Sequence, residues 1–243
     1  MSSRYHGFIG FGIALLIWLV FSMIYDPLVV PPIQDVAEAF ADFGYEFLGS
    51  LGMTFMRISI AFLISLVLGT IIGILIGYYR ILDTSSEALI DFMRSIPGIT
   101  LFPLFILLFG VSDISRVLVA IYVGIPIIII NTKYGVINSS KLRKNMAELY
   151  RMTRLDFFTK VIIPEASPYI FTGLRIAISF SILVIVVTEM LLGTGHGLGS
   201  MIVTSQFQFD TASMFAILIV LGLIGFTLNL GFDRLEKRIF HWR

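Results

Sequence analysis

Few side chains in this sequence are suited to covalent or metal chemistry. There is no cysteine, which excludes a disulfide framework, a thiolate metal site and a cysteine nucleophile. His6 and His241 lie near the two ends and His196 lies in a glycine-rich stretch, so no Ser–His pair is available for an intramembrane serine protease. The phosphate-binding pattern G-x-x-x-x-G-K-[ST] is missing, so we expect no bound ATP or other cofactor and no enzymatic activity.

The stretch 133–165 combines basic and apolar residues in one short segment. Its Lys and Arg residues are interleaved with apolar residues at helical spacing, which are Leu142, Met146, Leu149, Phe157 and Val161. The pattern is typical either of a solvated, positively charged loop or of a short helix pair that docks onto a partner. In the second case apolar anchors would enter a groove and the charges would surround it.

The composition indicates the environment of the whole chain. Of its 243 residues, 57% are hydrophobic and only 14% are charged, and the mean hydropathy is +0.95. Soluble domains carry about 25% charged residues because their surfaces face water. The outer surface is therefore expected to face a lipid bilayer. No continuous basic patch or motif indicates binding to nucleic acid.

A helix needs about 20 mainly apolar residues to cross a bilayer. On this criterion we expect an all-α polytopic protein with about six spans (five to seven allowed), forming one transmembrane domain over residues 1–243. Between the first two spans, an amphipathic helix over about 36–47 is expected to lie along the membrane surface. The six spans cover about 7–25, 53–79, 84–110 with Pro97 and Pro103 inside it, 115–131 with Pro126 inside it, 167–192 and 211–232.

Lys and Arg residues concentrate on one side of these spans. Six spans place both termini on the side that receives the 133–165 cluster, whereas the opposite side receives at most Arg57 and Arg116 and the acidic stretch 26–50. Basic residues accumulate on the cytoplasmic face of membrane proteins. Both termini are therefore expected to be cytoplasmic.

Ionisable residues within spans are functional candidates because a charge costs roughly 2.5–3.5 kcal/mol to insert. Arg175 either extends back to the cytoplasmic surface or faces a bundle interior or an aqueous cavity. Glu189 lies near the outer end of the same span, beside the glycine-rich loop 193–199. It is either solvated at the interface or part of a gate. Arg57 is expected to extend outward to water.

Gly69, Gly73 and Gly77 repeat every four residues and therefore share one helix face. Small residues at this spacing let helices approach closely inside a membrane. We expect packing within the chain, with a subunit interface as the alternative. The prolines within spans are expected to kink their helices, and kinked spans often line a cavity.

Several short motifs, in this order, resemble the permease subunits of binding-protein-dependent ABC importers. The likeness is greatest to the branch that serves nitrate, sulfonate, taurine, bicarbonate and pyrimidine-precursor importers, and it runs from about Pro31 to the C-terminus. No single motif is specific, but their ordered combination is. The motifs are Ser50-Leu51 with Thr54 and Arg57, Gly69, Gly73 and Gly77, Arg94-Ser95-Ile96-Pro97, Pro103-Leu104 with Phe109-Gly110, Asn131-Thr132 with Gly135, Ala147 and the run to Val161-Ile162-Ile163-Pro164, Gly173-Leu174-Arg175, Glu189, and Gly197-Leu198-Gly199.

This resemblance implies a type I importer bundle in a prokaryotic inner membrane. The partners implied are cytoplasmic ABC ATPase subunits, which would bind the ATP, an external solute-binding protein, and a second permease that is either an identical copy or a paralogue. The cargo implied is a small anionic or polar solute. The alternative is a secondary transporter or channel, which would need an intramembrane ion site.

The resemblance also suggests roles for individual residues. Within 133–165, the segment expected to couple to the ATPase, the candidates are Ala147, Leu149, Arg151, Phe157 and Pro164. The candidates for the translocation path or its gate are Arg94, Pro97, Arg175, Glu189, Gly197 and Gly199.

One position departs from the family's coupling motif. The family's glycine falls on Arg151 and its leading glutamate falls on Asn145. Glycine suits a tight turn between helices because it reaches a positive φ without a Cβ clash. Arginine there implies either a turn with ordinary dihedral angles or local strain, and it suggests a subunit of a heterodimer.

Overall fold

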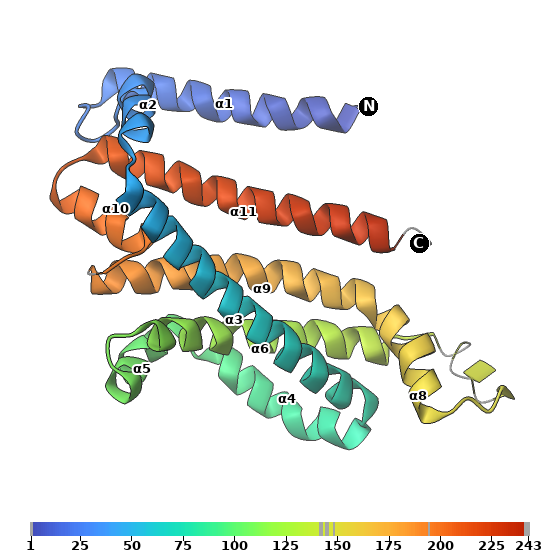
Figure 1. Cartoon of the computed structure of the whole chain (residues 1–243). Coiled ribbons are helices and arrows are strands. Elements are labelled where there is room, and N and C mark those ends of the chain that lie inside the picture. Colours follow the sequence, from blue (N-terminus) through green and yellow to red (C-terminus); the bar gives the residue numbers. More distant parts are fainter. Residues whose placement is uncertain (1, 141–142, 144–145, 148, 194, 241–243) are drawn as a thin grey trace. The chain divides into compact units, whose positions relative to one another are not determined.

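The chain folds entirely into helices over the residues that the computed structural model describes, which are 2–140, 143, 146–147, 149–193 and 195–240, with side chains from residue 9 on (Figure 1). Helices satisfy every backbone polar group internally, as a bilayer requires. In chain order they are α1 Ser2–Ile24, α2 Ile33–Asp42, α3 Tyr45–Tyr78, α4 Arg80–Ser95, the 3-10 helix η1 Gly98–Leu101, α5 Phe102–Phe109, α6 Asp113–Ile137, α8 Arg154–Phe157, the π-helix η2 Phe158–Ile162, α9 Ile163–Leu192, α10 Leu198–Phe207 and α11 Thr211–Ile239.

The apolar helices agree with the expected all-α polytopic fold. Among the described residues, four stretches are long and apolar enough to cross a membrane: α3, α6, Arg154–Leu192 and α11. A fifth span results if α4 and the η1–α5 pair are counted together, although they are bent by 81°. The stretch Ile9–Ile24 of α1 is a shorter apolar helix.

Three predicted boundaries are wrong. The amphipathic helix ends at Asp42, and α3 begins at Tyr45, so Phe47 belongs to a different helix from Val36. The helix expected from Thr84 begins at Arg80, and the Thr84 hydroxyl donates to the Arg80 carbonyl (3.1 Å) inside α4 rather than capping its start. The last helix continues through the charged residues after 232 to Ile239.

The chain divides into two compact units. Residues 1–53 and 189–224 form the first unit. In its core, Val36 and Ala39 of α2 are buried with Ala216 of α11. Trp18 of α1 packs on Phe215 with ring centroids 5.9 Å apart, and its indole N–H donates to the Pro31 carbonyl (3.1 Å). The amphipathic pattern of α2 is therefore explained by burial within this unit.

Residues 54–188 and 225–243 form the second unit, in which α6 packs closely against α3. A Cβ at Gly69 would lie 2.7 Å from Ile128 Cβ, and one at Gly73 would lie 2.6 Å from Thr132 Cβ. At Gly77 the corresponding distance to Val136 Cβ is 2.8 Å. Only glycine allows this approach, so the expected packing within the chain is confirmed.

Helix α6 also packs closely against α9, and glycines allow this contact too. A Cβ at Gly135 would lie 3.0 Å from Ala166 Cα, and one at Gly173 of α9 would lie 2.7 Å from Asn131 Cβ. Lys133 of α6 also forms an ion pair with Asp83 of α4. Helix α6 thus contacts α3, α4 and α9 (Figure 1).

Candidate translocation and coupling sites

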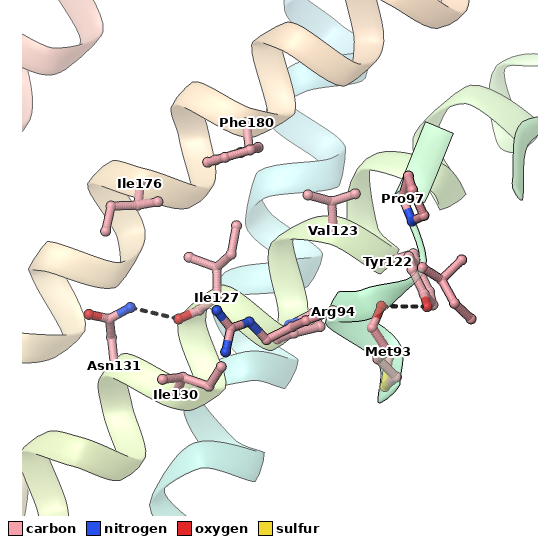
Figure 2. A pocket seen from close by; sticks show the side chains of 13 residues that line it. Met93, Arg94, Pro97, Tyr122, Val123, Ile127, Ile130, Asn131, Ile176 and Phe180 are labelled. Atoms are coloured by element: carbon pink, nitrogen blue, oxygen red, sulfur yellow. Dashed lines mark hydrogen bonds between the residues drawn. The ribbon is translucent and has the colours of Figure 1, made fainter. Parts of the chain in front are cut away.

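The break between α4 and α5 lies beside a cavity in the second unit. Pro97 follows the end of α4, and the chain turns there into η1. Gly98 packs against α6 so closely that a Cβ would lie 2.2 Å from Val123 Cγ2. The cavity has a volume of about 450 Å³ and is bounded by residues of α4, α6 and α9 (Figure 2). The structure therefore brings the predicted path residues Arg94 and Pro97 together.

The lining of this cavity is mainly apolar, with three polar side chains. Arg94 extends into it from the last turn of α4 (Figure 2). The Asn131 amide donates to the Ile127 carbonyl (2.8 Å), and the Tyr122 hydroxyl donates to the Met93 carbonyl (2.9 Å). Sequence reasoning did not assign Tyr122 or Asn131 to the path. Asn131 was noted only as part of a family motif, and Tyr122 lies among apolar residues with no motif around it.

Glu189 is buried, not solvated at an interface. Its side chain belongs to the first unit, where only 1% of the residue is exposed. Its carboxylate accepts a hydrogen bond from the Gly199 N–H (2.9 Å) near the start of α10. Gly197, at φ 155°, packs so closely that a Cβ would lie 2.5 Å from the Glu189 carboxyl carbon. The structure thus brings Glu189, Gly197 and Gly199 together, and the alternative of interfacial solvation is wrong. The gate itself stays a prediction.

Arg175 contacts α11 and does not line the cavity at Arg94. Its guanidinium donates to Glu236 (2.8 Å) and lies 3.6 Å from Asp233. Asp233 and Glu236 were expected in a tail outside the last span, but α11 carries them as part of the helix. Arg175 thus has carboxylate partners on α11, and its side chain is 35% exposed.

Arg57 does not extend outward to water. It is 2% exposed and binds Asp113, with 2.7 Å between Arg57 Nη2 and Asp113 Oδ1. Arg116, also buried, lies 3.0 Å from the same oxygen. A hydropathy pattern could not reveal this cluster because Arg57 and Asp113 are 56 residues apart.

The coupling segment exposes apolar side chains. Leu149 is 82% exposed, Tyr150 74% and Leu155 75%, whereas Ala147 is buried. Phe157 is only partly exposed and lies near Tyr78 of α3, with ring centroids 6.5 Å apart. The chain turns at Arg151, where a turn between two helices was predicted. Beyond this turn Leu155, rather than the predicted anchor Phe157, is the exposed apolar residue. Leu142, Lys141, Lys144 and Asn145 lie outside the described residues.

The two ends of this segment are attached to the membrane helices. Glu165 accepts a hydrogen bond from the Ser140 N–H (2.5 Å) and pairs with Arg143 (2.9 Å). Phe158 packs on Tyr78 with centroids 4.5 Å apart. Thr153 caps α8 by accepting from the Asp156 N–H, and Arg154–Leu192 continues as one apolar stretch that includes Pro164. The segment is therefore continuous with α9 and packs on α3.

Arg151 adopts the left-handed conformation that suits glycine. Its φ is 50°, and the Met152 N–H donates to the Ala147 carbonyl (3.1 Å), which is the hydrogen bond of a Schellman helix end. Of the two alternatives for this turn, strain is thus the one observed. The left-handed conformation costs about 1–2 kcal/mol for a residue with a Cβ.

Residues 65–241 match the family described as binding-protein-dependent transport system inner membrane component. The chain belongs to this family. It is 34% identical over 179 residues to the nitrate import permease protein NrtB of Leptolyngbya laminosa, a match that covers 74% of this chain and 64% of the relative, just under two thirds. It is 30% identical over 204 residues to the putative aliphatic sulfonates transport permease protein SsuC of Bacillus subtilis, covering 82% and 71%. The predicted ABC importer permease of the nitrate and sulfonate type is confirmed.

Solved structures share the fold. The chain superposes on a subunit of the MetNI methionine ABC transporter, in an inward-facing conformation, with a TM-score of 0.69. The match covers 80% of this chain and 96% of the other at 17% sequence identity. The type I importer fold is therefore confirmed. The relatives are permease subunits rather than enzymes, and in such systems a separate subunit hydrolyses ATP.

The contacts of Glu189 predict a specific loss of transport in Glu189→Gln. The substitution removes a charge-assisted hydrogen bond to the first turn of α10, which is worth about 1.5–3 kcal/mol. Solute uptake by membrane vesicles should fall more than the amount of folded protein, measured by fluorescence-detected size exclusion. Glu38→Gln changes an exposed carboxylate of the same unit and should leave both unchanged. Normal uptake in the Glu189 variant at equal expression would contradict the gate assignment.

The conformation of Arg151 predicts that Arg151→Gly strengthens the coupling turn. Glycine removes the Cβ clash, and we expect the hydrogen bond between the Met152 N–H and the Ala147 carbonyl to gain about 1–2 kcal/mol. Hydrogen exchange of the Met152 amide should slow accordingly. Arg151→Ala keeps a Cβ and removes only the guanidinium, so it should not slow the exchange. Equal exchange rates in both variants would show that the turn is not strained.

Proposed function

We propose that this permease carries a small anionic or polar solute inward across a prokaryotic inner membrane. An external solute-binding protein would deliver the solute, and cytoplasmic ABC ATPase subunits would dock on the segment 133–165. The observation that carries the proposal is the exposure of Leu149, Tyr150 and Leu155 in a basic segment connected to α9. Membership in the permease family supports the general identity of both partners.

The exposed apolar side chains of the basic segment 133–165 favour docking on a partner over a solvated loop. Burying a side chain such as leucine contributes about 1.5–3 kcal/mol, and few such residues dominate an interface. Tyr150 and Leu155 therefore join Leu149 as proposed anchors. Ala147, Arg151, Phe157 and Pro164 would shape the segment, since Ala147 is buried and Phe157 lies against Tyr78.

Coupling would proceed through the unbroken helix. When the ATPase subunits move, the docked segment would move with them, and α8 and η2 would transmit that movement into α9. A π-helix such as η2 is often found at functional sites. The contact between Phe158 and Tyr78 would carry the same movement into α3. Alternating access would follow from these helix movements.

The path would use Arg94 and Pro97 at the cavity of the second unit and Glu189, Gly197 and Gly199 as a gate in the first. Arg175 would act as a structural link between α9 and α11 at its ion pairs with Asp233 and Glu236. A second permease, either an identical copy or a paralogue, would complete the assembly. The strained Arg151 turn, where the family motif has glycine, supports the paralogue.

If the segment docks through its apolar residues, Leu149→Asp and Leu155→Asp should insert normally but lose the ATPase. Each change places a charge where a buried contact is expected, and we expect ATPase copurification and solute-stimulated hydrolysis to fall at least tenfold. Lys160→Ala removes an exposed charge of the same segment and should lose little. If both Asp variants still copurify with the ATPase and transport the solute at the original rate, the docking model is wrong.

The charge distribution predicts the orientation of the chain. A reporter that is active only in the cytoplasm should be active when fused after Arg243 and inactive when inserted near Asp42, because basic residues stay on the cytoplasmic side. The expression of both fusions is compared by immunoblot. The reverse pattern would place 133–165 outside the cell and remove the basis for ATPase docking there.

A further inference from the structure

We propose that the cavity of α4, α6 and α9 binds an organic anion with an apolar body, with Arg94 as its counter-ion. The inference rests on the proposed function and names the chemical class of the solute more narrowly. It distinguishes a sulfonate or carboxylate with a hydrocarbon chain from a small inorganic anion. The residues that carry it are Arg94, Asn131 and the apolar walls contributed by α6 and α9.

The cation of the cavity, Arg94, has only a weak ion pair. Among the described residues, the lining of the cavity includes Arg94 and no Asp or Glu. The nearest paired carboxylate, Asp91, is 3.8 Å from the Arg94 guanidinium, and both side chains are more than half exposed. An exposed pair at this distance contributes little. The planar guanidinium can therefore offer two parallel N–H groups to a sulfonate or carboxylate, which is the geometry that arginine recognises best.

A second donor faces the same space. One N–H of the Asn131 amide is held by the Ile127 carbonyl, which leaves the other N–H of the amide to be offered to a ligand. Asn131 is kept in place by α9, because Gly173 packs directly against its Cβ. Arg94 from α4 and Asn131 from α6 thus line the cavity from different helices (Figure 2).

The remaining walls favour hydrocarbon. Ile96, Ile127, Ile130, Ile176 and Phe180 all line the cavity. Its volume of about 450 Å³ lies in the range of small-molecule sites, which is about 300–1,000 Å³. A hydrated inorganic anion gains nothing from these side chains. A hydrocarbon chain gains up to about fourfold in affinity for each methylene that leaves water.

The position of the cavity suits a solute that must pass the membrane. It lies at the 81° break between α4 and the η1–α5 pair, and transporters build solute sites at such interrupted helices. The carbonyl end of α4 also stabilises the cation at Arg94. An anionic lipid combines a charged group with apolar chains, so the same chemistry could come from a lipid headgroup, and the experiment must separate the two sources.

Binding is measured on the full chain in nanodiscs of zwitterionic lipid by isothermal titration calorimetry. The probes are hexanesulfonate, ethanesulfonate, nitrate and hexyltrimethylammonium. We expect hexanesulfonate to bind most tightly, ethanesulfonate at least tenfold more weakly, and nitrate and the cation not detectably. Equal binding of nitrate and hexanesulfonate would overturn the requirement for an apolar body, and equal binding of the hexyl cation would overturn the role of charge.

Variants of the cavity then test the named residues. Arg94→Gln should weaken hexanesulfonate binding at least tenfold, and Arg94→Lys should weaken it less, because the charge remains. Arg80→Gln, an exposed residue at the other end of α4, is the matched control and should bind normally. Ile176→Ser should reduce the advantage of hexanesulfonate over ethanesulfonate. An unchanged affinity in Arg94→Gln, with thermal unfolding showing a folded protein, would overturn the proposal.

Nanodiscs that contain phosphatidylglycerol distinguish a solute from a lipid. If the anionic lipid abolishes the Arg94-dependent binding of hexanesulfonate, the cavity is a lipid site and the proposal is wrong. Unchanged binding supports it. The binding measurement does not involve an ATPase. If the unchanged protein does not bind hexanesulfonate but copurifies with the ATPase, only this inference is contradicted. Loss of copurification with normal binding contradicts only the docking model.

Discussion

The second unit depends on the close approach of α3 to α6, which Gly69, Gly73 and Gly77 make possible. In a bilayer, burial of apolar side chains does little to bring helices together, because lipid tails are equally apolar. Association must come from dense packing, and the distances at these glycines show that any larger residue would separate the helices. Gly135 and Gly173 repeat the arrangement between α6 and α9. Helix α6 thereby supplies one wall of the cavity and keeps Asn131 beside α9.

Several charges that lie within the described helices are paired. Asp113 contacts both Arg57 and Arg116, and Arg175 contacts Glu236. Removing one partner would leave an uncompensated charge, which is strongly unfavourable in a buried setting. Arg94 differs, because its ion pair with Asp91 is long (3.8 Å) and both side chains are more than half exposed. Such a pair contributes little, which leaves the Arg94 guanidinium able to bind a ligand.

Two residues at helix ends have features that the packing of a single helix does not require: backbone strain at Arg151 and a buried carboxylate at Glu189. The left-handed Arg151 lies where the segment 133–165 turns, and the buried Glu189 contacts Gly197 and Gly199 at the start of α10. Neither feature improves the packing of an isolated helix. Both connect one helix end to the next, and an importer needs such connections if docking at one end is to change access at the other.

The sequence by itself determined the membrane class, the all-helical fold, the interrupted third span and the family, because hydropathy, proline and short motifs are local properties. The packing of Gly69, Gly73 and Gly77 within the chain also followed from their spacing. Only the tertiary structure decided which residues meet across helices. Arg57 and Asp113 are 56 residues apart, and Arg175 and Glu236 are 61 apart, so their pairing depends on how helices are rotated and staggered. The burial of Glu189 and the exposure of Leu155 have the same origin, since a hydropathy pattern contains neither the direction of a turn nor the neighbour that covers a side chain.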